Sequence, residues 1–382
     1  MSNPHQPGHR SEAAQVELHS PLSSIATPCN EATPIVAICL LGMGLLLPAR
    51  PALSENVEPV RPVRSVAVTF DDLPAAKAAF PPAEACDFPA IERATHRLLK
   101  AAKTHNAPLA GFVNEGKKCP EWKPEAFNAL LDAWLDAGAE LGNHTYSHVD
   151  LYNTTLTAYK ADIVRGEAAL GAALERRGRK VRFFRHPYLH SGLDPGVRKD
   201  LRRFLEGRGY ADAPVTIDNQ DWMFTEVYAR AKGRHDEKTM ALVAEAYLRY
   251  LDELFAHAEQ LSTQLLGYEV RQILLMHTSA LNFEHFDDIA RTIERRGYRF
   301  ISLEEALADK AYGEPVPPKG SWLRGWAARK GRTPRPAPRV SAFLGTLYRD
   351  YPAAPPATPG TGPIDRIAIA NRGETTDTNV TR

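Results

Sequence analysis

Hydrophobic residues follow two spacings along the middle of the chain, and together these spacings predict alternating strands and helices. Short runs rich in β-branched and aromatic residues are typical of buried strands, whereas apolar residues three and four positions apart are typical of helices that cover a sheet. The predicted strands are residues 65–70, 107–113, 139–144, 181–188, 213–219, 271–277 and 298–303. The predicted helices are residues 88–105, 124–138, 155–178, 194–209, 238–267 and 283–297.

The order of these elements, with each strand followed by a helix, favours a parallel sheet with right-handed crossovers. Seven such strands predict an α/β barrel if the sheet closes on itself. The pattern leaves open the alternative of an open parallel α/β sheet. We assign residues 65–312 to one catalytic domain of this class.

The N-terminal region has a different composition and indicates an export signal. Residues 35–47 form an apolar run that is short for a bilayer span but suits the core of a signal peptide, with small residues just before Glu55 for cleavage. Residues 1–34 carry one Arg against three Glu, unlike a usual signal, so a true start further downstream and a buried core helix both stay open. We predict a leader over residues 1–54, a linker over 55–64, and localisation to the periplasm or cell envelope.

The C-terminal region, residues 313–382, contains eleven of the thirty prolines. Such a segment is expected to bury too little apolar surface to offset the entropy lost on ordering, so we predict a disordered tail. Its stretch 322–332 carries two Trp among basic residues. We expect this stretch to be solvated; the alternative is that it lies on a membrane surface or an anionic glycan. Any membrane contact is expected only through the leader or this tail.

Charge and cysteine content add little to the functional interpretation. The formal net charge of the 382 residues is +1, which gives no general attraction to nucleic acid, and we expect no such partner. Cys29 and Cys39 lie in the predicted leader, and Cys86 and Cys119 remain after it. In an oxidising compartment this second pair could form a disulfide, and two unrelated thiols are the alternative.

Polar motifs follow the ends of five predicted strands. In a βα barrel, the carboxyl ends of the strands lie together and carry the active site. A run of polar motifs at these ends therefore favours a catalytic centre over simple solvation. The motifs are Asp71 and Asp72, then HTYSH (144–148), RHPY (185–188), DNQDW (218–222) and HTS (277–279).

Asp72, His144 and His148 predict a site for a divalent metal ion. Two imidazoles and one carboxylate form a three-ligand set that leaves positions open for water and substrate. A cation at this place would also relieve the repulsion between the adjacent carboxylates of Asp71 and Asp72. The alternative is that both histidines cap the start of a helix.

Asp71 is then the remaining carboxylate, and we predict that it is the general base that takes a proton from a metal-bound water. Arg185 follows the apolar residues of the fourth predicted strand. There it would pair with Asp71 and hold it ionised. A surface salt bridge is the alternative for Arg185.

Asp221 and His277 predict a general acid, because a carboxylate beside an imidazole raises its pKa and fixes its tautomer. A lone histidine at the end of a buried strand is otherwise more often a core residue. Trp222 and Met276 are candidates for the walls of a small substrate pocket, or are ordinary core residues. Backbone N–H groups near Tyr188 would hold an oxyanion. Together these groups describe hydrolysis of a carbonyl compound, with His277 protonating the leaving group.

The motifs TFDD, HTYSH, RHPY, DNQDW and LLMH, in this order, resemble those of the polysaccharide deacetylase family, also called the NodB-homology domain. The resemblance extends over residues 65–303. It implies a distorted (β/α)7 barrel and removal of N- or O-acetyl groups from glycans. It also implies a divalent metal, zinc or else cobalt or nickel.

Residue by residue, the resemblance implies a complete set of catalytic roles. These roles are the base (Asp71), its partner (Arg185), the metal ligands (Asp72, His144, His148), the backbone oxyanion donor (Tyr188), the acid (His277) and the partner of the acid (Asp221).

Two departures from the family pattern bear on the substrate. Leu73 stands where the family commonly has Gly, and "LHS" separates the RHPY motif from Gly192. We expect a metal-dependent hydrolase that deacetylates an N-acetylated glycan such as peptidoglycan or chitin. The alternatives are an esterase or small-amide hydrolase of the same fold, and a glycan-binding module without catalysis.

Overall fold

The computed structural model describes residues 64–350. The predicted leader lies outside the described residues, as do the linker up to residue 63 and residues 351–382. None of the helices within 64–350 combines the length and the apolar character that a membrane span requires.

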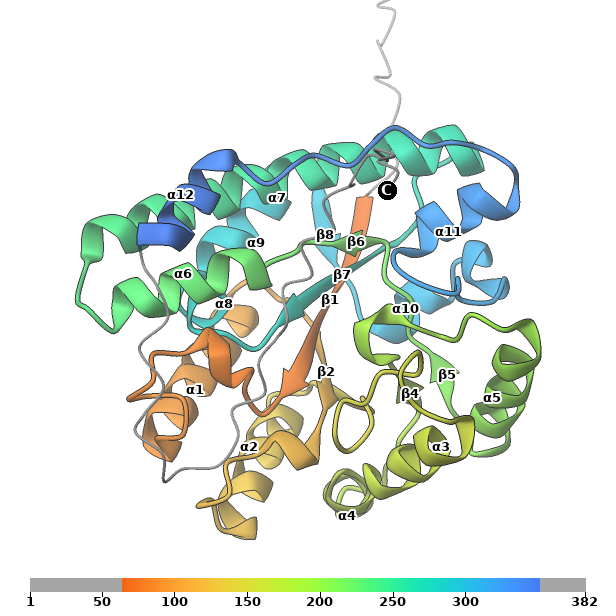
Figure 1. Ribbon diagram of the computed structural model, residues 1–382, viewed down its shortest axis with the longest axis horizontal. Helices are drawn as coiled ribbons and strands as arrows, with labels where there is room; N and C mark the ends of the chain where they lie inside the picture. Colours follow the sequence, from red (N-terminus) through yellow and green to blue (C-terminus); the bar gives the residue numbers. More distant parts are fainter. Residues whose placement is uncertain (1–63, 351–382) are drawn as a thin grey trace, which may run out of the picture. The chain divides into compact units, whose positions relative to one another are not determined.

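The described strands form one parallel sheet (Figure 1). Neighbouring strands follow the order β5-β4-β3-β2-β1-β7-β6, and β8 pairs with the first residues of β1. This order runs around a ring in sequence with one break, between β5 and β6, which confirms a distorted (β/α)7 barrel over an open doubly wound sheet. The strands are β1 Arg64–Leu73, β2 Leu109–Val113, β3 Glu140–Asn143, β4 Phe183–Phe184, β5 Ala211–Asp212, β6 Ile217–Asp218, β7 Gln272–His277 and β8 Tyr298–Phe300.

Helices follow most of the strands, and several start at the caps that the sequence provides. Asp194 accepts a hydrogen bond from the Val197 amide ahead of a Pro at the first helical position, and Thr155 caps a second helix in the same way. The α-helices are α1 Phe88–Thr104, α2 Pro124–Asp136, α3 Leu156–Arg165, α4 Ala168–Glu175, α5 Pro195–Gly207, α6 Trp222–Lys232, α7 Glu237–Leu266, α8 Ala280–Glu284, α9 Phe286–Arg295, α10 Leu303–Leu307, α11 Trp322–Arg329 and α12 Ala342–Asp350. The 3₁₀ helices are η1 Lys77–Ala79, η2 Glu115–Lys117, η3 Pro187–Leu189 and η4 Lys310–Gly313.

The two faces of β1 serve different purposes. Val68 and Phe70 belong to the large apolar cluster that also contains buried residues of the covering helices. Ala67 belongs to a second cluster with Phe112 of β2 and residues of α10, which fills the inside of the ring. Because side chains alternate along a strand, the inward face continues from Ala67 towards Asp71 at the carboxyl end. The barrel therefore has a packed base and a polar upper end.

Several predicted elements are wrong in extent, among them two strands. The fourth strand is confined to Phe183–Phe184, because the chain turns into η3 at Pro187. The predicted strand 213–219 is only Ile217–Asp218, preceded by the unpredicted two-residue β5, because its first residues lie at the break in the sheet.

The predicted helix 155–178 is two helices, α3 and α4, separated at Gly166. A Cβ at Gly166 would lie 2.9 Å from the side-chain oxygen of Asn143 and from the backbone of Thr145. The break therefore lets the chain pass directly against the segment that carries His144, where a continuous helix with a larger residue would not fit.

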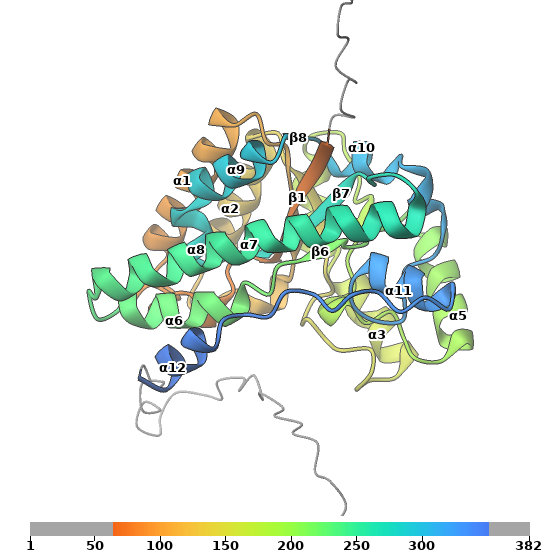
Figure 2. The same ribbon diagram turned by 90° about the horizontal axis from the view of Figure 1, so that it is seen from above.

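The prediction of a disordered tail is wrong for residues 313–349. Trp322, Leu323 and Ala327 of α11 are buried in the large apolar cluster, and α11 contacts α7 while α12 contacts α6 (Figure 2). The high proline content suggested disorder, but one face of α11 supplies enough apolar surface to fix the segment. Trp322 and its neighbours are therefore part of the fold, not a solvated stretch.

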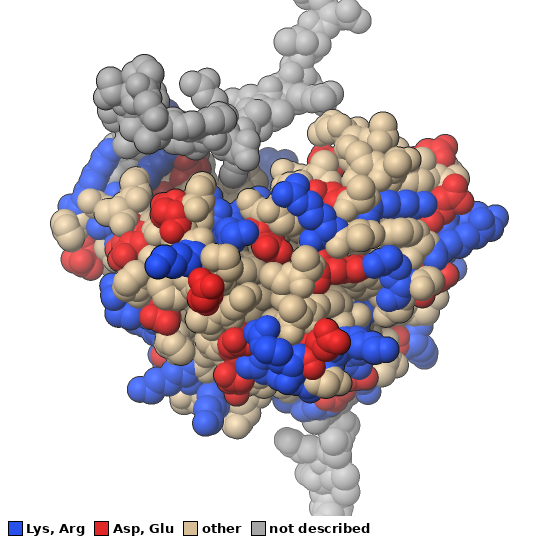
Figure 3. Space-filling model, turned by 90° about the horizontal axis from the view of Figure 1, so that it is seen from below, with Lys and Arg blue, Asp and Glu red and all other residues tan. Residues whose placement is uncertain are grey.

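On the face seen in Figure 3, basic and acidic side chains of the described residues are interspersed. This mixture is consistent with the near-zero net charge of the whole chain.

Candidate active site

Asp71 and Asp72 lie at the carboxyl end of β1, and a local irregularity lets both carboxylates serve one site. Asp72 has a positive φ of 67°, and the pairing of β1 with β2 shifts register between Phe70 and Leu73. In a regular strand two adjacent side chains would point to opposite faces. Here Asp71 Oδ2 lies 3.6 Å and Asp72 Oδ1 lies 4.0 Å from the same atom, Nε2 of His144.

The three residues predicted to hold a metal ion come together. Asp72 Oδ1 lies 3.4 Å from His148 Nε2, and Asp72, His144 and His148 each offer a ligand atom within 4.8 Å of the others. All three side chains are largely buried. One acidic oxygen and two imidazole nitrogens at this spacing are a donor set suited to a transition-metal dication such as zinc.

The protonation states of the two histidines also fit a metal ion. His144 Nδ1 donates a hydrogen bond of 2.7 Å to the carbonyl oxygen of Arg185, which leaves Nε2 facing the two carboxylates. Burial lowers the pKa of both His144 and His148 to about 3, so their imidazoles are neutral near pH 7. A neutral imidazole with its remaining nitrogen directed at a carboxylate is the form that binds metal.

Asp71 is held by Arg185, as predicted from the sequence. Arg185 Nη1 donates to Asp71 Oδ1 at 3.0 Å, and the guanidinium also donates to the Ala213 carbonyl at 2.6 Å and to Thr69 Oγ1 at 3.1 Å. The surface salt bridge considered for Arg185 is excluded, because the side chain is 1% exposed and lies over the ring of Phe112. Burial raises the pKa of Asp71, and the charge of Arg185 offsets part of this rise.

Asp221 and His277 form the second predicted pair. Asp221 Oδ1 lies 2.7 Å from His277 Nδ1, and Asp221 Oδ2 accepts the backbone N–H of His277 at 2.7 Å. Burial disfavours the charged imidazole, but the Asp221 carboxylate, with smaller contributions from Asp72 and Asp71, outweighs this and raises the pKa of His277 to about 10. His277 of β7 is the register partner of Asp71 of β1. The Asp221–His277 pair therefore lies next to the Asp71–Arg185 pair.

The remaining three predicted site residues, Tyr188, Trp222 and Met276, differ in how far they are buried. Tyr188 is in η3 with a positive φ of 58°, is 57% exposed, and its ring centre lies 4.6 Å from that of His148. Trp222 directly follows Asp221 at the start of α6 and is 48% exposed, so it is not a core residue.

Met276 is not a wall of the site. It is fully buried in the cluster between the sheet and the helices, opposite Phe70 of β1. Alternation along β7 places Met276 on the face opposite to His277, which explains why the predicted pocket role is wrong.

Three residues of the site were missed in the sequence. Lys117 Nζ lies 3.4 Å from Asp72 Oδ1, and this ammonium with the nearby histidines holds the pKa of Asp72 well below its usual range despite burial. Asn282 Nδ2 donates to Asp221 Oδ2 at 2.5 Å and to the His277 carbonyl at 2.8 Å. Asn114 Nδ2 donates to the carbonyls of His144 and Thr145. Only Asn114, which directly follows a predicted strand, carried a usable signal.

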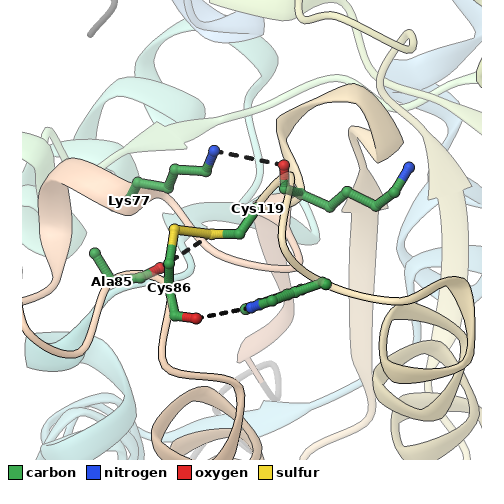
Figure 4. Close-up of a disulfide and its surroundings, with 6 residues drawn as sticks. Lys77, Ala85, Cys86 and Cys119 are labelled. Atoms are coloured by element: carbon green, nitrogen blue, oxygen red, sulfur yellow. Dashed lines mark hydrogen bonds between the residues drawn. A yellow bond between two sulfur atoms is a disulfide. The ribbon is translucent and has the colours of Figure 1, made fainter. Parts of the chain in front are cut away.

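A disulfide joins the loops that follow β1 and β2 at this end of the barrel (Figure 4). Cys86 and Cys119 are bonded with their Cα atoms 5.7 Å apart, which resolves the two alternatives left open by the sequence. The Trp122 indole donates to the Cys86 carbonyl at 2.8 Å. Lys117 lies two residues before Cys119, so the disulfide also fixes the base of the loop that carries it.

Part of the chain matches a known protein family. Residues 59–203 match the family model described as polysaccharide deacetylase, which confirms the family assignment for that part of the chain. The match contains Asp71, Asp72, His144, His148 and Arg185, and it ends before the segments that carry Asp221 and His277. No curated protein sequence matches the chain.

Solved structures of low identity show similarity over about two thirds of the chain. A family 4 carbohydrate esterase from Streptomyces lividans, in complex with acetate, is 21% identical over 64% of this chain and 95% of that one, with a TM-score of 0.39. A polysaccharide deacetylase from Bacillus cereus is 20% identical over 63% and 91%, with a TM-score of 0.39. A CE4 family pseudoenzyme from Bacillus anthracis is 16% identical over 64% and 65%, with a TM-score of 0.40. At these scores, the fold assignment rests on the strand order of the chain itself.

Proposed function

We propose that this protein is an exported, metal-dependent hydrolase that removes acetyl groups from an N-acetylated glycan. One observation carries the proposal: Asp72, His144 and His148 converge beside Asp71, which Arg185 holds in place. The family match supports a deacetylase that acts on a glycan. The metal dependence and the roles of individual residues are the further parts of the proposal.

Asp71 is the general base in this scheme. Its Oδ1 is engaged by Arg185, while its Oδ2 faces the ligand atoms of the metal site. Burial brings the pKa of Asp71 upward towards the range where a carboxylate accepts a proton effectively. Arg185, itself held by a backbone carbonyl, fixes the orientation of the carboxylate.

His277 is the general acid. Near pH 7 it carries a proton, because the Asp221 carboxylate raises its pKa to about 10. Asp221 takes Nδ1 of the ring, so Nε2 is the nitrogen that delivers the proton to the leaving amine. Asn282 holds the other Asp221 oxygen and so keeps the pair aligned.

Asp72, His144 and His148 would hold the metal ion, with zinc the first candidate and cobalt or nickel the alternatives. When bound there, such an ion would polarise the acetyl carbonyl and activate water for attack. The Tyr188 peptide would stabilise the oxyanion. Trp222 lies exposed beside Asp221 and would line the substrate side of the site.

The disulfide supports the localisation in this proposal. Disulfides persist in oxidising compartments such as the periplasm, and are rare in the cytosol. The pair Cys86–Cys119 therefore agrees with export.

The decisive experiment combines metal analysis with acetate release on the chain from Glu55 to Arg382. The substrate panel contains chitooligosaccharides, peptidoglycan fragments, acetylxylan and small acetamides. We expect about one bound metal ion per chain, held by Asp72, His144 and His148, and acetate from the N-acetylated glycans. Release only from acetylxylan or only from small amides would favour the esterase or small-amide hydrolase. Metal binding without any acetate release would favour the glycan-binding module without catalysis.

Asp71→Asn tests the base within the same assay. We expect normal metal content and a rate loss on the order of a hundredfold or more, because the amide cannot accept the proton. Asp200→Asn is the control, since Asp200 lies exposed on α5. Full activity in Asp71→Asn would contradict the assignment of the base.

A further inference from the structure

The loop that carries Tyr188 adopts a backbone conformation that is costly for its residues. Tyr188 and Leu189 have φ values of 58° and 55°, in the left-handed region that bulky side chains seldom occupy. Such conformations persist where surrounding structure holds them in place. Another part of the molecule is therefore expected to hold this loop.

The loop is held by a segment more than 120 residues further along the chain, residues 314–329, which we call the strap. Ser191 donates its backbone N–H to the Pro318 carbonyl at 2.9 Å and its hydroxyl to the Pro317 carbonyl at 2.8 Å. The Gly320 N–H donates to the Leu189 carbonyl at 3.2 Å. Three hydrogen bonds thus tie the loop to the first part of the strap.

The strap also lies where the barrel is open. Between β5 and β6 the strands are not paired with each other. Here the Trp322 N–H donates to the Val215 carbonyl at 2.6 Å, and the Ser321 hydroxyl donates to the Thr216 carbonyl at 3.0 Å. The strap therefore satisfies backbone groups that a neighbouring strand would take in a closed barrel.

The second part of the strap is anchored tightly. Trp322 is fully buried and packs edge-on against Tyr312, with ring centres 5.5 Å apart. Gly325 of α11 lies directly against Pro317, and a Cβ at this position would stand 2.1 Å from the Pro317 Cβ. Any side chain at Gly325 must displace the Pro317–Pro318 turn, and this turn is what Ser191 binds.

We propose that the strap is a positioning element of the active site: through Pro317 and Pro318 it fixes Ser191, and through Ser191 it fixes the peptide of Tyr188. This inference rests on the proposed function for the catalytic use of that peptide. The ring of Tyr188 also contacts His148, so a shift of the loop would also affect a predicted metal ligand. The strap lies outside the segment that matches the family model, so it is a feature of this chain and not of the matched segment.

Gly325→Ala is the test, and Gly345→Ala is its matched control. Both glycines are helical, but a Cβ at Gly345 meets no atom within 4 Å. In the metal-loaded protein, we expect Gly325→Ala to speed hydrogen exchange at the amides of residues 189–191. We also expect kcat to fall by about ten- to a hundredfold with KM nearly unchanged, because an oxyanion donor acts only in the transition state. Gly345→Ala should match the parent in both measurements.

The outcomes separate this inference from the proposed function. Unchanged exchange at residues 189–191 in folded Gly325→Ala would overturn the mechanical link. Faster exchange with an unchanged kcat would overturn the positioning role and leave the strap as a purely structural element. If Gly325→Ala does not fold, Ser191→Ala, which removes only the hydroxyl bond to Pro317, gives the same two readouts. If the parent releases no acetate, the proposed function fails, while the exchange data still decide whether the strap holds the loop.

Discussion

The two sides of the candidate active site contain the same side chain in opposite chemical states. His144 and His148 are buried without a carboxylate bonded to Nδ1, and their pKa values fall to about 3. His277 is buried too, but its Nδ1 is bonded to Asp221, and its pKa rises to about 10. Burial lowers the pKa of all three imidazoles, and the difference is that only at His277 does a carboxylate bonded to the ring reverse this effect, with help from Asp72 and Asp71.

This difference divides the labour between the two sides. Neutral imidazoles are metal ligands, and a charged imidazole is a proton donor. Asp71 lies between the two sides, with Oδ2 towards His144 and its backbone paired with His277. The predictions below test whether the two sides are as distinct in solution as their surroundings imply.

The largest effect is expected on the metal side. Asp72→Ala removes the only carboxylate of the three-residue ligand set, so we expect loss of bound metal and loss of acetate release below detection. Elemental analysis of the dialysed protein measures the first and the acetate assay the second. Asp87→Ala, at the start of α1, is the control. Retention of metal in Asp72→Ala would show that the ion binds elsewhere.

On the acid side the effect should be smaller and should spare the metal. His277→Ala removes the proton donor, and we expect kcat to fall by about 10²- to 10⁴-fold with metal content unchanged. His96→Ala is the matched control, because His96 is exposed on α1. Loss of metal in His277→Ala would make His277 a ligand and would erase the distinction between the two sides.

Most of this division could be predicted from the sequence, because the residues sit in motifs at strand ends. Asp72, His144 and His148 follow two strands that are separated by one neighbour in the sheet, so their convergence follows from barrel topology. Asp221 and His277 required only that the last strands return beside β1. Their residue types and their positions after predicted strands identified these five residues.

Other features depend on contacts that no local pattern encodes. Lys117 and Asn282 lie 45 and 61 residues from the acids that they contact, and neither belongs to a motif. The proline content of residues 313–349 predicted disorder wrongly. The burial of a few apolar side chains such as Trp322 against the rest of the fold stabilises this segment enough to offset the cost of ordering it. The pocket role predicted for Met276 is wrong because neighbouring residues of β7 lie on opposite faces, so Met276 points away from His277.

The two sides should also act in opposite directions on stability. For His277 the folded pKa is raised, so its contribution is complete below about 6.5, the ordinary value, and is lost as pH rises towards 10. For His144 and His148 the folded pKa is lowered, so stability is lost as pH falls from about 6.5 towards 3. The metal-free protein should therefore be most stable near neutral pH.

Denaturant unfolding of the metal-free protein at a series of pH values measures these two slopes. We expect each arm to amount to a few kcal/mol, since one pKa unit corresponds to about 1.4 kcal/mol. Asp221→Asn should flatten the alkaline arm and leave the acid arm in place. An alkaline arm that persists in Asp221→Asn would show that another group is responsible.

The smallest effect concerns Lys117, which no motif identified. Its ammonium lies 3.4 Å from the Asp72 oxygen and is about one third exposed, so solvent screens part of its charge. A positive charge beside a metal ligand competes with the ion for that ligand. We therefore expect Lys117→Met to tighten zinc binding by several-fold, about 1 kcal/mol or less for a partly screened charge, as measured by competition with a chelating dye.

Lys118→Met is the matched control, because Lys118 pairs with Glu115 and not with Asp72. Weaker zinc binding in Lys117→Met would mean that the ammonium orients Asp72 instead of competing for it. In that case the metal side, like the acid side, would depend on a charged neighbour to hold its carboxylate, and the contrast between the two sides would lie in the histidines alone.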